Sequence, residues 1–452
     1  MSKIHGIILA AGEGTRMNSD MPKVLHRLSD KTLLDHVLIK ARNVCKQVHI
    51  VYGYMGEQVM SSVNDSSISW VHQSEQLGTG HAVAQVIPHI DNDSISLIMY
   101  GDVPLIKEST LNELIVKAEE WGLSLLSIDL KNPTGYGRII RTEGQIMAIV
   151  EQKDANTEQL NISEVNTGFI AIKSKLLKKY LNLIGNDNFQ SELYLTDIIA
   201  LAVDDGRMVG SVISTDRFEV AGVNDKVQLA ELERALQKQQ ALDFMRQGIT
   251  IKDPSRFDCR GTLSFGKDCT IDFNVLIDGK VELGEKVSIS PNCIIKNSTI
   301  GNNVEVLPNT VIEDAVIGDE ASIGPFARIR PQTEIGNNVK VGNFVEIKKS
   351  RIGNNSKASH LSYIGDTTIG EDVNIGAGVI TCNYDGTNKH KTDIKDGAFV
   401  GSNSQLVAPV VIGKNATIGA GSTITKDAPD GALTLSRTKQ STLKKGFSPS
   451  KK

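Results

Sequence analysis

The sequence predicts two domains of different fold class: an α/β domain with a doubly wound parallel sheet, followed by an all-β parallel β-helix. The first half of the chain alternates strand-like and helix-like segments, which is typical of a parallel sheet covered by helices. From Ile271 to Ala428 an aliphatic residue recurs at every sixth position, a period that fits neither an α-helix nor a simple strand. Short strands joined at tight corners and stacked coil upon coil have this period.

Composition restricts the class of protein further. The 452-residue chain is long enough for two or three domains, and its 40% hydrophobic and 23% charged residues are typical of a soluble globular protein. A net charge of −4 provides no general nucleic-acid-binding surface. No apolar run approaches the ~18 residues of a membrane span, and the N-terminal run is too short for a signal peptide. The 5 cysteines form no Cys-x-x-Cys pair, so we expect reduced thiols in a cytoplasmic protein.

A glycine-rich turn follows the first predicted strand, Ile4 to Ala11. It reads Ala10-Ala-Gly-Glu-Gly-Thr-Arg16. Glycines let backbone N–H groups approach a phosphate closely, and Arg16 and Lys23 supply charges that pair with phosphate oxygens. The turn lacks the Gly-Lys-Ser/Thr of a Walker A loop, and a Gly-x-Gly by itself also fits a plain tight turn.

The following segments predict a sheet whose carboxyl edge binds a ligand. Helical patterns at 33–44, 81–86 and 109–121 alternate with strand patterns at 48–52, 96–100 and 123–130. Asp102, in Tyr100-Gly-Asp-Val-Pro104, comes directly after one of these strands. A carboxylate at that position can hold a divalent cation beside phosphates, or it can cap a turn or a helix.

Taken together, these motifs resemble the sugar-nucleotide pyrophosphorylase family. The resemblance rests on Leu9-Ala-Ala-Gly-x-Gly-Thr-Arg-Met17, Pro22-Lys23, Gln73, Gly78-Thr79, Tyr100-Gly-Asp102, Gly137, Glu151, Asn166-Thr-Gly168 and Asn224. It implies a Rossmann-like fold that transfers a nucleotidyl group from a nucleoside triphosphate to a sugar 1-phosphate and releases pyrophosphate. One departure is Glu13, where the family often has Lys.

The same resemblance implies roles for individual residues. Lys23 and Arg16 would bind the triphosphate during transfer, and Asp102 and Asn224 would hold Mg²⁺. The remaining nucleotide-site residues are Leu9, Ala10, Ala11, Gly12, Gln73, Gly78, Thr79, Tyr100 and Gly101, and the sugar-site residues are Gly137, Glu151 and Asn166.

A helical linker is expected between the two domains. Residues 225–247 carry a stripe of leucines and alanines, Asp225 can cap the start, and Gly248 can end the helix. We therefore predict a first domain over 1–224, a linker over 225–248 and a second domain over 249–452. The alternative is a helix that packs wholly onto the first domain.

The six-residue repeat is interrupted at a few places, and the longest interruption indicates a functional site. Steps of five residues at several corners are readily tolerated, but residues 381–393 form a longer excursion without the expected inward aliphatic residues. Arg330 and Lys348 replace the usual corner residues about one coil from His360. Two cations near a histidine indicate a phosphorylated substrate beside a general base.

Hexapeptide repeats of this kind are similar to those of the left-handed β-helix acyltransferases, which use CoA thioesters and form trimers. The domain order, over about 4–440, resembles the bifunctional N-acetylglucosamine-1-phosphate uridyltransferases/glucosamine-1-phosphate acetyltransferases. The resemblance implies acetylation of glucosamine 1-phosphate by acetyl-CoA, then uridylyl transfer from UTP. The product, UDP-N-acetylglucosamine, is a cell-wall and lipopolysaccharide precursor.

By that resemblance His360 is the acetyl-transfer base and the protein is a homotrimer. The implied glucosamine-1-phosphate-binding residues are Arg330, Lys348, Tyr363, Asn374 and Lys389. The implied acetyl-CoA-binding residues are Ala377, Asn383, Tyr384, Ser402, Ala420 and Arg437.

Two other functions remain open on the residues alone. One is a single-activity pyrophosphorylase whose β-helix is regulatory, and the other is a non-catalytic subunit of a eukaryotic translation-initiation nucleotide-exchange factor. Cys382 lies close enough in sequence for a covalent role in acyl transfer. The basic tail from Arg437 is either a solvated end or an arm that reaches a phosphorylated ligand.

Overall fold

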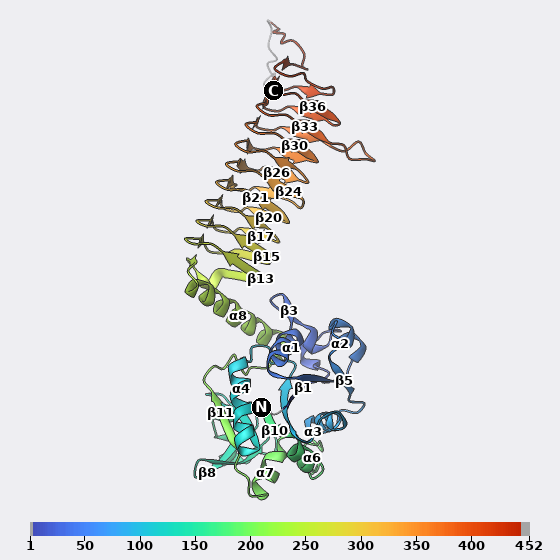
Figure 1. The fold of residues 1–452 in the computed structure, drawn as a ribbon, viewed down its shortest axis with the longest axis vertical. Coiled ribbons are helices and arrows are strands. Elements are labelled where there is room, and N and C mark those ends of the chain that lie inside the picture. The colour runs from blue at the N-terminus through green and yellow to red at the C-terminus, as the bar shows by residue number, and fades with distance from the viewer. Residues whose placement is uncertain (1–2, 444–452) are drawn as a thin grey trace, which may run out of the picture. The chain divides into compact units, whose positions relative to one another are not determined.

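The computed structural model describes residues 3–443, which form two compact units that divide between Leu236 and Gln237. The first unit contains a mixed sheet in the order β11-β7-β10-β6-β1-β4-β5, with the hairpin β8–β9 attached to β10 (Figure 1). Its strands are β1 Lys3–Ala10, β2 Arg27–Leu28, β3 Lys31–Thr32, β4 Gln47–Tyr52, β5 Ser69–His72, β6 Ser94–Tyr100, β7 Leu123–Asp129, β8 Arg138–Thr142, β9 Gln145–Val150, β10 Glu164–Lys173 and β11 Gly210–Ser214. Its helices are α1 Leu33–Val44, α2 Gly56–Ser62, α3 Thr79–Ala84, α4 Glu108–Trp121, α5 Thr157–Leu160, α6 Ser174–Leu181 and α7 Asp197–Asp204.

The sheet is doubly wound, as predicted. Ile7 and Ile8 are neighbours in β1, so their side chains lie on opposite faces, and they belong to different apolar clusters. Helices α1 and α4 pack on the face of Ile8, and α3, α6 and α7 pack on the face of Ile7.

Strand β10 and the hairpin β8–β9 depart from the expected parallel arrangement. β1 is parallel to both β4 and β6, but β10 runs antiparallel between β6 and β7. The hairpin β8–β9 precedes β10, and β8 pairs antiparallel with both β9 and β10, so the chain enters β10 from the opposite end of the sheet. The carboxyl edge of β1, β4 and β6 remains intact.

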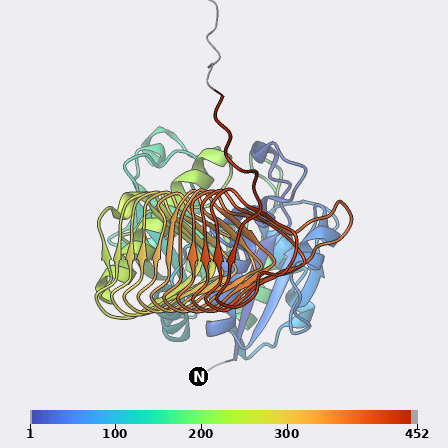
Figure 2. The same ribbon diagram turned by 90° about the horizontal axis from the view of Figure 1, so that it is seen from above.

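The second unit is a parallel β-helix, as the six-residue period predicts (Figures 1 and 2). Its strands form three stacks, one on each face of the coils. The first stack is β12 Thr250–Ile251, β14 Thr270–Ile271, β16 Ser288–Ile289, β19 Glu305–Val306, β22 Ser322–Ile323, β25 Lys340–Asn343, β28 Lys357–His360, β31 Asn374–Ile375, β34 Phe399–Val400, β37 Thr417–Ile418 and β39 Leu433–Thr434. The second is β13 Phe257–Phe265, β15 Val275–Leu283, β17 Ile294–Lys296, β20 Val311–Glu313, β23 Arg328–Ile329, β26 Glu346–Lys348, β29 Tyr363–Gly365, β32 Ile380–Cys382, β35 Gln405–Val407 and β38 Thr423–Ile424. The third is β18 Thr299–Ile300, β21 Ala315–Ile317, β24 Thr333–Ile335, β27 Arg351–Ile352, β30 Thr367–Ile369, β33 Thr392–Ile394 and β36 Val410–Ile412, and the long strands β13 and β15 extend onto this face.

The inward aliphatic residues set the register of the coils. Ile329 pairs with Ile347, and both side chains are fully buried. At many corners the backbone is left-handed, for example at Asn338 with a φ of 53° and Asn355 with a φ of 62°. Asn tolerates this conformation better than most residues, because its short polar side chain can hydrogen-bond locally. The repeat thus encodes both the buried core and the corners.

Helix α8, Lys226–Arg246, connects the two units. Asp225 Oδ1 accepts a hydrogen bond of 2.8 Å from the backbone N–H of Gln228, which confirms it as the cap. Leu232 packs into the core of the first unit, whereas Ala241 belongs to the core of the second. The alternative that the helix packs wholly onto the first domain is therefore wrong. Within residues 3–443, no helix combines the length and the apolar character that a membrane crossing requires.

A buried histidine pair lies in the first unit, between β1 and β4. The side chains of His5 and His49 are inaccessible to solvent, and His5 Nδ1 is 2.9 Å from His49 Nε2. Burial, followed by the nearby His5, His89 and Lys3, lowers the pKa of His49 to about 4. Burial also lowers the pKa of His5. Both imidazoles are therefore neutral in the folded protein near pH 7.

This pair predicts an acid-sensitive first unit. The folded-state pKa of His49 lies near 4 and the ordinary value is 6.5, so the unfolded chain binds more protons between these values. Stability is then fully present above about pH 6.5 and is lost as the pH falls toward 4. Trp70 and Trp121, the 2 tryptophans of the chain, both lie in this unit, so tryptophan fluorescence reports its unfolding.

His49→Gln should flatten the dependence of the fluorescence melting temperature on pH, because glutamine keeps a hydrogen-bonding nitrogen but does not titrate. The control is His72→Gln, at an exposed histidine, which should behave as the wild type does. Equal slopes for His49→Gln and the wild type between pH 4 and 6.5 would contradict this account.

Candidate active sites

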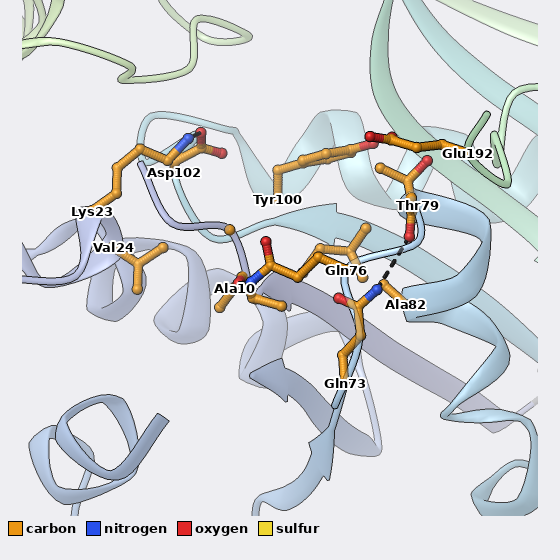
Figure 3. Close-up of a pocket in the computed structure, with 14 residues that line it drawn as sticks. Ala10, Lys23, Val24, Gln73, Gln76, Thr79, Ala82, Tyr100, Asp102 and Glu192 are labelled. Carbon is orange, nitrogen blue, oxygen red and sulfur yellow. Dashed lines mark hydrogen bonds and ion pairs between the residues drawn. The ribbon is translucent and has the colours of Figure 1, made fainter. Parts of the chain in front are cut away.

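A cavity of about 290 Å³ opens at the carboxyl ends of β1 and β6 and at the start of α3 (Figure 3). The cavity lies at the carboxyl edge of the parallel strands, which is where sheets of this kind bind their ligands. Its lining consists of Leu9, Ala10, Ala11, Gly12, Lys23, Val24, Gln73, Gln76, Gly78, Thr79, Ala82, Tyr100, Asp102 and Glu192. Ten of these residues were expected from the sequence, and they come from five separate motifs.

The glycine-rich turn forms one wall of the cavity. Gly14 has a φ of 63°, and a Cβ atom added there would lie 2.6 Å from Lys23 Cβ, so glycine is required on both counts. The carbonyl oxygen of Ala11 accepts a hydrogen bond of 2.8 Å from Gln76 Nε2, which fixes the turn against the neighbouring segment. Glu13 is exposed and does not line the cavity.

Arg16, Lys23, Asp102 and Asn224 form one hydrogen-bonded group, in which Lys23 and Asp102 line the cavity. Lys23 Nζ forms an ion pair with Asp102, and these two side chains are only 17% and 14% exposed. Asn224 Oδ1 accepts hydrogen bonds from Lys23 Nζ at 3.3 Å and from Arg16 Nη2 at 3.0 Å. Figure 3 shows Lys23 and Asp102 pointing toward one another. The structure thus brings both predicted cations together with both predicted Mg²⁺ ligands.

The donor set at this point fits Mg²⁺. Asp102 and Asn224 offer a carboxylate and an amide oxygen, and Mg²⁺ is usually held by one or two such groups, with water and phosphate oxygens completing its shell. In the described part of the chain, no cluster of three or more His, Cys, Asp or Glu residues is arranged as a protein-only metal site.

The predicted sugar-site residues Gly137, Glu151 and Asn166 do not line the cavity. The backbone N–H of Asn166 donates to the carbonyl of Gly137 at 2.8 Å, and Glu151 Oε1 accepts a hydrogen bond of 3.1 Å from Thr196. Burial raises the pKa of Glu151 above its usual value, and burial followed by Glu151 and Asp102 raises the pKa of Tyr100. Gly101 is held at the end of β6 by its N–H, which donates to the carbonyl of Leu9 at 2.9 Å.

Four lining residues were not predicted from the sequence: Val24, Gln76, Ala82 and Glu192. Val24 and Ala82 neighbour the predicted residues Lys23 and Thr79, so the motifs could have been extended to them. Gln76 lies three residues after Gln73, in a segment without regular structure. Glu192 comes from the loop before α7, far along the chain, and no motif marks it.

The second group of predicted residues lies on the β-helix. Asn343 and His360 are in register on adjacent coils, and the carbonyl of His360 accepts a hydrogen bond from the N–H of Gly378 on the next coil. The carbonyl of Ala377 accepts from Asn403, and that of Ser402 accepts from Gly421. Residues of successive coils therefore form one line along the corner, which we call the corner column: Asn343, His360, Ala377, Ser402 and Ala420.

The corner column aligns the predicted base with three of the six predicted acetyl-CoA residues. His360 is exposed at one end, followed by the small residues Ala377, Ser402 and Ala420. Three coil steps of about 4.8 Å separate His360 from Ala420, a distance of about 14 Å. At the far end, Arg437 Nη1 donates to the carbonyl of Ala420 at 2.9 Å.

Asn343 determines the tautomer of His360. Asn343 Oδ1 lies 2.8 Å from His360 Nδ1, and an amide oxygen only accepts hydrogen bonds, so Nδ1 carries the proton. Nε2 is then left with its lone pair exposed to solvent, which is the form needed for a general base. Sequence reasoning missed Asn343, although its distance of one coil from His360 could have indicated it.

The predicted phosphate-binding cations lie on the adjacent face. Lys348 is paired in register with Gly365, and Arg330 follows Ile329, the partner of Ile347, so the two cations occupy successive coils. Arg330 Nη1 is 2.7 Å from Glu346 Oε1. Lys389 extends from the excursion to Lys348, and this neighbouring ammonium lowers the pKa of Lys389. The structure brings Lys348 and Lys389 together, and Arg330 occupies the position equivalent to Lys348 on the preceding coil.

The other predicted residues of this domain lie on several elements of the β-helix. Asn383 is buried and donates from Nδ2 to Asp366 Oδ2 at 2.6 Å. A Cβ atom added at Gly365 would lie 2.5 Å from the Tyr363 hydroxyl and 2.8 Å from Asn383 Nδ2, so this glycine leaves room for both side chains. Asn374 lies in β31, in register with Lys357 of the preceding coil, and Tyr384 is exposed in the excursion. Lys444, Lys445, Lys451 and Lys452 of the basic tail lie outside the described residues.

Fold and sites define a nucleotidyltransferase domain joined to a hexapeptide-repeat transferase domain. Family models agree: residues 6–132 match the MobA-like NTP transferase domain, residues 259–333 the GMPPB C-terminal domain, and residues 391–426 the bacterial transferase hexapeptide (six repeats). Bifunctional protein GlmU of Ruthia magnifica is 66% identical over 452 residues, which is 100% of both chains. The chain belongs to the family of bifunctional GlmU proteins.

Other relatives show the same full-length similarity. Bifunctional protein GlmU of Vesicomyosocius okutanii is 65% identical over 98% of this chain and 99% of its own, and that of Marinobacter nauticus is 51% identical over 97% of each. Among solved structures, a UDP-glucose pyrophosphorylase complexed with UDP-glucose aligns with 53% of this chain and 100% of that chain, at 19% identity and a TM-score of 0.44. This sequence identity and this TM-score are too low to support a conclusion about the function of the chain.

Proposed function

We propose that the protein makes UDP-N-acetylglucosamine in two steps at two separate sites. Glucosamine 1-phosphate is first acetylated by acetyl-CoA on the β-helix. N-acetylglucosamine 1-phosphate then receives UMP from UTP in the first unit, and pyrophosphate leaves. The observation that carries this proposal is full-length similarity, because the chain is 66% identical over all 452 residues to a bifunctional GlmU protein.

For acetyl transfer, we assign the base role to His360. Its Nε2 removes a proton from the amine of glucosamine 1-phosphate as the nitrogen attacks the thioester carbonyl, while Asn343 holds the imidazole by its Nδ1–H. The C–S bond then breaks, and coenzyme A leaves as the thiol after taking up that proton from Nε2. Arg330, Lys348 and Lys389 bind the phosphate, and the corner column binds acetyl-CoA. Burial raises the pKa of the Cys382 thiol, which favours direct transfer over a thiolate intermediate.

For uridylyl transfer, the residues position the reactants and spread charge. The backbone of residues 9–12 approaches the phosphates, and Lys23 and Arg16 pair with the triphosphate oxygens. Bound Mg²⁺, held by Asp102 and Asn224, would neutralise charge on the phosphates. A phosphate oxygen of the sugar attacks the α-phosphorus in line, so no covalent enzyme intermediate is needed.

We also propose that the protein is a homotrimer. Phe326, Phe344 and Leu361 lie at successive corners, where they are 49%, 55% and 63% exposed. Their φ angles of 55°, 56° and 51° are uncommon for large apolar residues, and other corners use Asn there. The two phenylalanine rings stack with centroids 5.2 Å apart. An exposed apolar ladder at unfavourable backbone positions is best explained by burial against another copy.

We place the protein in the cytoplasm because its thiol content and substrates fit that compartment.

Paired substitutions test the separation of the two activities. Asp102→Ala should abolish uridylyl transfer and leave acetyl transfer intact, since only the first site loses its metal ligand. His360→Ala should lower the acetyl-transfer rate by at least about 100-fold, the usual contribution of a general base, and spare uridylyl transfer. Each activity is measured on its own substrates. Loss of both activities in either folded variant would refute two independent sites.

The exposed apolar ladder of Phe326, Phe344 and Leu361 predicts that the protein is a trimer in solution. Sedimentation equilibrium of the wild type should give three times the chain mass, and Phe344→Asp should shift the protein toward monomers, because a charge would be buried in the interface. Lys340→Asp, at an exposed position on the strand before this corner, is the control. A monomeric wild type at micromolar concentration would contradict the proposal.

A further inference from the structure

The excursion between β32 and β33 is a small hairpin that projects from the side of the β-helix and is drawn in orange in Figure 1. Tyr384 and Lys389 pair antiparallel, and the N–H of His390 donates to the carbonyl of Asn383 at 2.9 Å. Residues 384–389 are exposed, so no core holds this hairpin in place. Its shape must come from its own polar contacts.

Asp385 is the centre of those contacts. Its Oδ1 accepts hydrogen bonds from the backbone N–H groups of Thr387 at 2.8 Å and Asn388 at 2.6 Å. Its Oδ2 is 2.7 Å from His390 Nε2. The Asn388 N–H, followed by His390 and Thr387, holds the pKa of Asp385 well below its usual range. The carboxylate is therefore ionised and only accepts, so His390 Nε2 is the donor.

The bond between Asp385 and His390 closes the hairpin around Lys389. Lys389 directly precedes His390 in the chain, and its ammonium is held beside that of Lys348, which lowers the pKa of Lys389. Two like charges repel, so an unrestrained hairpin would move Lys389 away. The charged and titratable groups that act on Lys389 are Lys348, Asp366 and Tyr363. The carboxylate of Asp366 is mostly buried and is already engaged by Asn383 and Lys349.

We propose that His390 is a positioning residue of the acetyl-transfer site. By donating to Asp385, it holds the hairpin in the conformation that keeps Lys389 beside Lys348, and the two ammonium groups then form a preorganised site for the phosphate of the sugar. This inference rests on the proposed function, in which that phosphate belongs to glucosamine 1-phosphate. His390 acts only through Lys389 and does not touch the reacting atoms.

His390→Phe removes the donor and keeps an aromatic ring, whereas His390→Gln keeps a nitrogen donor at a similar reach. His390→Phe should raise the KM for glucosamine 1-phosphate about tenfold, which is a typical effect of losing a hydrogen bond to a charged group. The kcat and the KM for acetyl-CoA should change less than threefold. His390→Gln should restore the KM to within about threefold of the wild type, and inorganic phosphate should inhibit His390→Phe less than the wild type.

Thr387→Ala is the matched control, because it lies in the same hairpin and keeps the backbone N–H that Asp385 accepts. It should match the wild type in every measurement, and uridylyl transfer should be equal in all variants. Hydrogen–deuterium exchange over residues 383–391 gives a second readout. His390→Phe should exchange faster there than the wild type, and His390→Gln should not.

The two proposals fail in different ways. A wild type that does not acetylate glucosamine 1-phosphate would refute the proposed function, and the exchange measurement would still test the restraint of the hairpin. An active wild type with unchanged KM in His390→Phe would overturn the role of His390. Hydrogen–deuterium exchange over residues 383–391 that is the same in His390→Phe and the wild type would also overturn the role of His390.

Discussion

Stacking of the coils in register is the constraint on which the second unit depends. Each inward aliphatic residue packs on its counterpart one coil away, as Ile329 does on Ile347, and this contact sets the position of every outward residue. On the regular coils a residue therefore stands directly above a residue 17 or 18 positions earlier, as His360 stands above Asn343, and across the 381–393 excursion the interval is 25, as between Asn374 and Phe399. The buried scaffold thereby turns a regular sequence interval into the spatial contact that orients the base.

A related constraint organises the first unit. The parallel strands β1 and β6 end at the same edge of the sheet, so the residues after each strand converge. Lys23, Asp102 and Asn224 are far apart in the chain, yet their side chains meet in one hydrogen-bonded group. In both units the regular elements fix positions, and several of the predicted functional residues lie in the irregular segments between them. The glycine-rich turn and the projecting hairpin are the clearest examples.

Much of this arrangement follows from local sequence. The six-residue period predicted the coils, the glycine-rich turn predicted the cavity, and Asp225 predicted the start of α8. What the sequence could not predict depends on pairing between distant segments. The antiparallel direction of β10 is set by the hairpin before it, and periodicity carries no sign of direction. Glu192 reaches the cavity from a loop that has no pattern. The His5–His49 pair was hidden because each residue sits alone within an ordinary strand. Asp385 and His390 lay inside a segment already recognised as irregular, but their contact depends on the fold of the hairpin.

The most direct test of two transfer sites in one chain is an omission experiment. Purified protein is given glucosamine 1-phosphate, acetyl-CoA, UTP and Mg²⁺, and each component is then left out in turn. The complete mixture should yield UDP-N-acetylglucosamine and pyrophosphate. Acetylation should persist without UTP, and N-acetylglucosamine 1-phosphate should be uridylylated without acetyl-CoA. Failure of the complete mixture to form UDP-N-acetylglucosamine, or acetylation that requires UTP, would contradict the account.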